Sequence, residues 1–246
     1  MTGKLRFHED TVRLITLAVN RAITERVPLH HQENNFETNN HRWLLRGDLI
    51  NQCLKELLTV EGVSLHPFRR HGWQGRLIID QRRHISYSIV SQNSLDRVMK
   101  ALRRRNWPHY LHSLLFEENG DYDGMYMQES LFEAEDAFSS DTYEQDFHMI
   151  MEGMVENPDD WHHYIIVYRA AGNELKEIKL LFLNKEFIEI TDSVDLMEYA
   201  RPDYSALTVK TKKNTDDRKT TAERAKSLTK LKPGIKPELY SEEDEA

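Results

Sequence analysis

The stretch HHYIIVYRAAGNELKEIKLLFL, residues 162–183, decides the fold class of this chain. His163 to Ala170 and Leu175 to Leu183 are dense in β-branched, aromatic and leucine residues, and Ala171-Gly172-Asn173 separates them. Two such runs around a short Gly-Asn turn predict an antiparallel hairpin, because that turn suits the twist of paired strands. Phe187 to Thr191 could add a third strand.

A second β-rich pair lies upstream of this hairpin. Trp73 to Asp80 and His84 to Val90 flank Gln81-Arg82-Arg83 and predict another hairpin. Between the two hairpins the sequence indicates helix rather than strand. Ser94 is a suitable N-cap for a helix from Leu95 to about Arg105. Shorter helices are expected over Tyr110–Phe116 and Gln145–Val155.

The N-terminal part is helical in pattern. Leu5 to Ile23 and Arg42 to about Leu58 carry apolar residues at helical spacing, and Pro28 is expected to end the first helix or to follow soon after its end. Helices and hairpins occur in blocks without a strict βαβ alternation. The predicted fold class is therefore α+β, with N-terminal helices packed on antiparallel hairpins.

Composition divides the 246-residue chain and limits its class. With 39% hydrophobic and 30% charged residues, it is lean for a fully packed protein. We predict one α+β domain over residues 1–205 and a flexible charged tail over 206–246, disordered or ordered only by a partner. No run approaches the roughly 18 apolar residues of a membrane span. The single cysteine, Cys53, and the absence of a signal-peptide pattern indicate a cytoplasmic protein.

Charge is strongly segregated along the chain. Residues 66–105 hold ten Lys/Arg against two acids, a net charge of +8, whereas residues 117–160 hold fifteen acids and no Lys/Arg. The tail segment 209–237 has a net charge of +7, from ten Lys/Arg and three acids. The overall charge of −8 conceals this pattern.

The basic segment has two interpretations. It could contact a polyanion or another macromolecular partner, because the planar arginine fork suits phosphate and the interspersed aromatic residues could stack on bases. Alternatively, it packs against the acidic segment of the same chain and meets no nucleic acid. The lysine-rich tail 209–237 is a further candidate for electrostatic contact. The candidate binding residues are Arg69, Arg70, Arg82, Arg83, Arg103, Arg104 and Arg105.

An enzymatic alternative comes from Pro158-Asp159-Asp160 followed by Glu177-Ile178-Lys179, which resembles the signature of the PD-(D/E)XK nuclease family. Glu177 and Lys179 alternate along a strand and share a face. The resemblance implies that Asp159 and Glu177 would hold Mg²⁺ and that Lys179 would stabilise the attacking water. No cofactor is expected apart from this Mg²⁺, and the balance of the sequence favours a protein that is not an enzyme.

Two weaker patterns concern histidine. Arg105-Asn106 followed by His112 resembles the motif of the HEPN ribonucleases, although Pro108 interrupts it. His109 and His112 could share a helix face as a metal pair, but no ordered set of four ligands completes a structural zinc site.

Short spaced blocks carry one further resemblance. They are His41-Arg42-Trp43 with Asp48-Leu49-Ile50-Asn51, then Arg69-Arg70-His71-Gly72-Trp73, and then His109 to Leu115. Over about residues 5–200 the chain resembles an uncharacterised family of bacterial and phage-associated proteins, mainly from Firmicutes. The resemblance implies a bacterial protein linked to mobile elements or phage defence, and it supplies no site residues.

Overall fold

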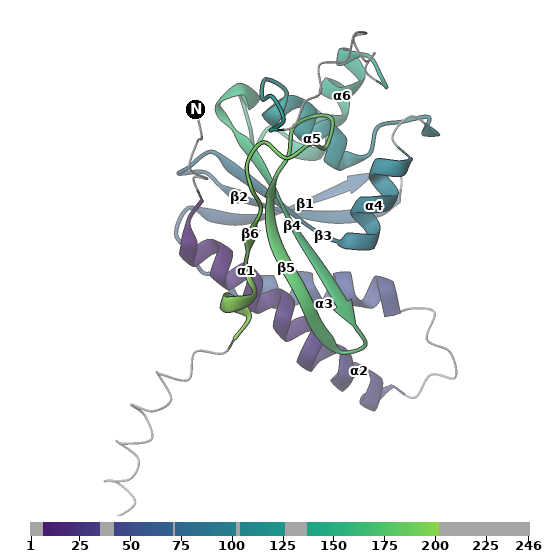
Figure 1. The fold of residues 1–246 in the computed structure, drawn as a ribbon, viewed down its shortest axis with the longest axis vertical. Helices are drawn as coiled ribbons and strands as arrows, with labels where there is room; N and C mark the ends of the chain where they lie inside the picture. Colours follow the sequence, from purple (N-terminus) through teal and green to yellow (C-terminus); the bar gives the residue numbers. More distant parts are fainter. Residues whose placement is uncertain (1–6, 35–41, 71, 102–103, 126–136, 202–246) are drawn as a thin grey trace, which may run out of the picture. The chain divides into compact units, whose positions relative to one another are not determined.

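A computed structural model describes residues 7–34, 42–70, 72–101, 104–125 and 137–201 (Figure 1). The predicted domain boundary after residue 205, the tail 206–246 and the candidate residue Arg103 lie outside these ranges, so they stay predictions. Within them the chain forms a mixed six-stranded sheet with helices on both faces, which confirms the predicted α+β class.

The sheet follows the order of the chain, β1-β2-β3-β4-β5-β6. All neighbouring pairs are antiparallel except β3 and β4, which are parallel in the centre. The sequence predicted antiparallel hairpins only, and this parallel junction between them is a correction. The strands are β1 (Val63–Arg70), β2 (Trp73–Asp80), β3 (Ile85–Ser91), β4 (His162–Ala171), β5 (Glu174–Phe182) and β6 (Val194–Asp195).

The hairpin predicted from residues 162–183 is present as β4 and β5. Ala171 pairs with Glu174 across a two-residue turn, in which Gly172 has a left-handed φ of 59° that glycine adopts without strain. The third strand expected over Phe187–Thr191 is wrong. That stretch makes only an isolated bridge from Glu189 to Leu183. The strand that pairs with β5 on the side away from β4 is β6.

Strand β1 was not predicted from the sequence. Its central proline, Pro67, is a poor strand former because it cannot donate a ladder hydrogen bond. Here the proline is tolerated because β1 is the edge strand of the sheet. Strand β1 pairs with β2 over its full length, from Val63 opposite Asp80 to Arg70 opposite Trp73.

Helices α1 (Glu9–Arg21), α2 (Val27–Glu33) and α3 (Arg42–Leu57) cover one face of the sheet (Figure 1). Of the two positions predicted for Pro28, the end of the first helix is wrong, because α1 already ends at Arg21 and Pro28 follows it. A π-helical turn, Ala22–Arg26, joins α1 to α2, and the Val27 N–H bonds to the Ala22 carbonyl. Pro28 then lies in the first turn of α2, where its missing N–H is tolerated.

Helices α4 (Gln92–Lys100), α5 (Tyr110–Asn119) and α6 (Ser140–Met151) cover the opposite face. The N-cap of α4 is Ser91 rather than the predicted Ser94, and its Oγ accepts from the Ser94 N–H at 3.2 Å. Each face of the sheet therefore has its own hydrophobic core. One is built around Ile15, Leu54 and Tyr164, and the other around Leu77, Leu114 and Phe147.

The sheet opens into a fork between β2 and β3. These strands pair only at Ile78, Ile79 and Asp80 of β2, although β2 pairs with β1 along all eight of its residues. Beyond this short ladder β3 continues beside β4, whereas residues 73–77 of β2 continue beside β1. The two halves of the sheet therefore separate towards the carboxyl end of β3.

Candidate functional site

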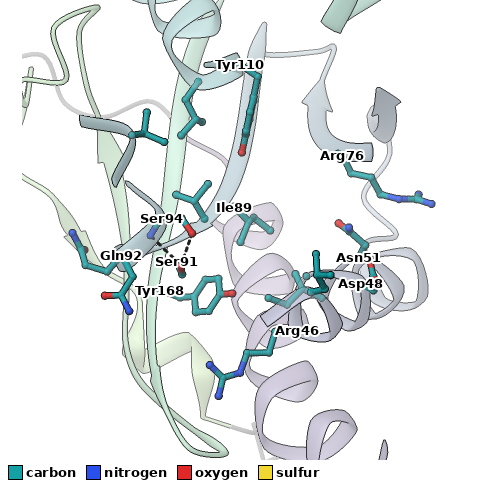
Figure 2. Close-up of a pocket in the computed structure, with 18 of the residues that line it drawn as sticks. Arg46, Asp48, Asn51, Arg76, Ile89, Ser91, Gln92, Ser94, Tyr110 and Tyr168 are labelled. Carbon is teal, nitrogen blue, oxygen red and sulfur yellow. Dashed lines mark hydrogen bonds between the residues drawn. The ribbon is translucent and has the colours of Figure 1, made fainter. Parts of the chain in front are cut away.

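A cavity of about 420 Å³ lies in this fork (Figure 2), and we call it the fork cavity. Its lining comes from α3, from the separated parts of β2 and β3, from the first turns of α4 and α5, and from the end of β4. Sites of this size accommodate small ligands or single building blocks of larger ones. The cavity also lies at the carboxyl ends of the parallel pair β3 and β4, a recurrent place for ligands in sheets with parallel strands.

Trp73 forms an aromatic platform beside the cavity. Its side chain is 46% exposed, and its ring stacks on Tyr110 with the ring centroids 5.4 Å apart. Gly75 makes this arrangement possible, because a Cβ at that position would lie 2.5 Å from the Phe68 ring and 2.7 Å from the Trp73 ring. The glycine therefore positions Trp73 through close ring-to-backbone packing.

A buried network of polar side chains lies next to the Tyr110 hydroxyl. This hydroxyl lies near Ser88, and the Ser88 hydroxyl lies 2.9 Å from His163 Nε2. The other ring nitrogen, Nδ1, lies 2.6 Å from the Ser86 hydroxyl, which donates to the Glu118 carboxylate. The sequence did not single out this Ser-His-Glu arrangement. All of its members are buried, so it acts as internal support rather than as an exposed nucleophile.

His109 caps the helix that carries Tyr110. Its Nδ1 accepts the Leu111 N–H at 3.3 Å, so the side chain satisfies one free donor of the first turn of α5. Burial lowers the pKa of His109 to about 3, and the positive charges of Arg105 and Arg70 add to that effect. The imidazole is therefore uncharged at neutral pH.

The structure divides the candidate arginines into different environments. Arg70 makes a partly buried ion pair, with Nε 2.8 Å from Asp146 Oδ1, and it also donates to the Pro108 carbonyl. Asp146 belongs to the acidic segment 117–160, so Arg70 packs against the acidic segment of the same chain, as the second interpretation of the basic segment predicted. Arg69, Arg104 and Arg105 are exposed and form no ion pair with any residue that the structure describes.

Arg82 and Arg83 lie at the opposite end of β2 from Trp73. Asp80 accepts from Arg83 Nη1 at 3.0 Å, and Arg82 pairs with the exposed Glu61. The eight residues from Trp73 to Asp80 span about 23 Å of strand, so these two arginines lie far from the exposed arginines beside the cavity.

Arg76 is a further exposed arginine beside the cavity, although the sequence analysis did not name it as a candidate. It is exposed, forms no ion pair within the described ranges and lines the fork cavity. Arg69 is paired with Gln74 in the ladder, so Arg76 is its diagonal neighbour on the same face of the hairpin. If β1 had been predicted, the alternation of side chains along β1 and β2 would have placed Arg69 and Arg76 on the same face of the hairpin.

The three residues of the nuclease-like motif do not converge. Lys179 and Glu177 form an ion pair at 2.5 Å, and Arg169 also contacts Glu177. Glu177 lies opposite Arg169, seven residues beyond the start of β4, which is about 23 Å along the strand. Asp159 precedes the start of β4 in a 3-10 turn, Pro158–Asp160, where it lies near Glu117 and helps raise the pKa of that carboxyl.

The histidine patterns likewise provide no metal or ribonuclease site. Arg105 is exposed, whereas His112 is buried between Tyr143 and Phe187, with its Nδ1 3.1 Å from the Tyr143 hydroxyl. Within the ranges that the structure describes, no three His, Cys, Asp or Glu side chains are grouped to hold a metal ion.

Fold and site together define an α+β protein with a basic cleft between two halves of a mixed sheet. The chain belongs to the family of unknown function DUF5986, whose model matches residues 4–246. No curated protein and no solved structure matches the chain. A search of the described residues for a helix long and apolar enough to cross a membrane finds none.

Proposed function

We propose that this protein binds nucleic acid at the end of the β1–β2 hairpin, beside the fork cavity. One observation carries the proposal. Exposed arginines that form no ion pair with any described residue, Arg69 and Arg76 among them, lie at the same end of the β1–β2 hairpin as a half-exposed tryptophan ring. Guanidinium groups contact phosphates, and an exposed indole stacks on bases irrespective of sequence. The residues that would carry this contact are Arg69, Trp73, Arg76, Arg104 and Arg105.

The internal pairing of Arg70 supports this proposal rather than opposing it. Asp146 neutralises the partly buried arginine, so that charge serves the fold and the exposed arginines stay available. A protein partner is the second candidate, because the same arginines would suit an acidic protein surface. The lysine-rich segment 209–237 would add an electrostatic contact in either case.

The test is fluorescence anisotropy of labelled oligonucleotides, titrated with the full chain at several salt concentrations. We expect binding at low salt, and a plot of log K against log salt whose slope becomes shallower by about 0.7 to 0.9 for every phosphate that a variant no longer neutralises. The double variant R69E/R76E should weaken binding and flatten the slope. R82E is the matched control, because Arg82 is exposed at the other end of β2.

Repeating the titration with a chain that ends at Val209 separates the hairpin from the tail. If the truncated chain still binds, and R69E/R76E abolishes that binding, the result supports the hairpin as the nucleic-acid-binding surface. If neither the full chain nor the truncated chain binds DNA or RNA at low salt, the proposal is wrong, and an acidic protein becomes the favoured partner.

A further inference from the structure

The fork cavity contains a tyrosine hydroxyl that no described residue of the protein hydrogen-bonds. Tyr168, at the end of β4, is only 8% exposed, and its hydroxyl has no hydrogen-bond partner among the described residues. Figure 2 shows this hydroxyl pointing into the cavity, towards α3. Burial raises the pKa of Tyr168, so the phenol keeps its proton and can both donate and accept. Water can hydrogen-bond this hydroxyl in the open cavity, and a ligand that displaces that water gains a donor and acceptor at a fixed position.

A guanidinium group with one N–H unpartnered among the described residues lies close to the Tyr168 phenol. Arg46, on α3, donates from Nη2 to the Gly172 carbonyl at 2.6 Å, but its Nε is buried without a hydrogen-bond partner among the described residues. Arg46 is close enough to act on the Tyr168 pKa through its charge. Two side chains whose hydrogen bonding the described residues do not complete therefore line the cavity, and they come from elements that are far apart in the sequence.

The remaining lining suits a flat, uncharged group with polar edges. Ile78 and Ile89 provide apolar walls, and the amide side chains of Asn51 and Gln74 provide donors and acceptors. Asp48 also lines the cavity, and its carboxylate disfavours a phosphate inside. Arg76 extends away from the centre of the cavity (Figure 2), which leaves positive charge at the rim.

Resting on the proposed function, we infer that the fork cavity receives one unstacked base of a single strand. The rim arginines hold the neighbouring phosphates, Trp73 stacks on the next base, and Tyr168 and Arg46 bond to the edge of the inserted base. A duplex keeps its bases stacked and paired, so it cannot fill the cavity without base flipping. The preferred partner is therefore single-stranded DNA or RNA.

The experiment compares a labelled 12-nucleotide single strand with the duplex of the same sequence, using the full chain at one fixed salt concentration. We expect the single strand to bind about 5- to 160-fold more tightly, the equivalent of one base stacked on an aromatic ring. Y168F removes only the hydroxyl. It should weaken single-strand binding about 2- to 12-fold, the equivalent of one hydrogen bond, and leave duplex binding unchanged.

Two further variants sharpen the result. I89W should fill the cavity and abolish the preference for the single strand, with thermal unfolding as the check that it folds. Y199F is the matched control, because the Tyr199 hydroxyl bonds to Glu9 on the surface and not in the cavity. Equal binding of single strand and duplex, or no effect of Y168F, would overturn this inference and leave the proposed function intact. Failure to bind either form would instead refute the proposed function.

Discussion

At the scale of single residues, a few buried polar side chains decide how the basic segment is used. Asp146 accepts from Arg70, from Trp107 Nε1 at 3.0 Å and from Ser113 Oγ at 2.5 Å. It thereby connects α6 to the edge of the sheet and to the segment that precedes α5. Tyr168 differs from Asp146, because its hydroxyl points into the fork cavity and has no hydrogen-bond partner among the described residues (Figure 2).

Replacing Asp146 by alanine should destabilise the protein by about 3–5 kcal/mol, because Arg70 would be left with an unpaired, partly buried charge. Urea unfolding measures this change in stability. The matched control is E61A, which removes the exposed partner of Arg82 and should cost no more than about 1 kcal/mol. Similar effects in the two variants would show that Asp146 is not a buried support.

His109 should make stability depend on pH. Its pKa is about 3 in the folded chain and near the usual 6.5 in the unfolded chain, so between these values the unfolded chain binds more protons. Stability is therefore fully present above pH 6.5 and falls as the pH drops below it, by up to about 1.4 kcal/mol per pH unit. H109N keeps a capping side chain without the titration. Unfolding free energies at pH 7, 6 and 5 should fall less for H109N than for the wild type, and parallel curves would contradict this assignment.

At the scale of secondary-structure elements, helix α5 fastens the sheet where β4 and β5 separate. The last residue of α5, Asn119, donates to the carbonyls of His163 and Leu183 and accepts the His163 N–H. These backbone groups lie just beyond the last ladder pair, Tyr164 and Phe182. One buried amide therefore replaces the ladder bonds that are missing at this point.

Removing this amide in N119A should cost about 3 kcal/mol, because three buried backbone groups lose their partner at once. Thermal or urea unfolding measures the change. N157A is the control, since Asn157 is exposed and its side chain bonds to the nearby Asp160 side chain on the surface. A cost below about 1 kcal/mol would mean that water replaces the amide.

At the scale of the whole molecule, both hydrophobic cores are built from residues between Phe7 and Ala200. Each core covers one face of the sheet, and the sheet runs from β1 at one edge to β6 at the other. The described elements thus supply a packed interior on both faces of the sheet.

Deleting residues 210–246 should therefore change the thermal midpoint by less than about 5 °C, which for a chain of this size corresponds to about 1–2 kcal/mol. Differential scanning calorimetry of the full and truncated chains tests this expectation. A larger fall would show that the tail packs against the folded part.

The sequence by itself determined the local structure of this protein. Hairpins β2–β3 and β4–β5 and helix α3 follow from alternation, turn residues and helical spacing, which act between near neighbours. The sequence also shows the basic and acidic segments, because counting charged residues along the chain is enough to find them. Strand β1 was missed because its central proline opposes the strand pattern and only the sheet edge makes it acceptable.

Only the tertiary structure decided which side chains meet. The parallel pairing of β3 with β4 joins residues more than 70 positions apart, and no local pattern specifies such a contact. That pairing draws β3 away from β2, opens the fork and places Tyr168 beside Arg46. The register of the β4–β5 hairpin separates Asp159 from Glu177, and the length of β2 separates Arg82 from Arg69. Register and strand order place a side chain in space, and both are set by packing across the whole sheet.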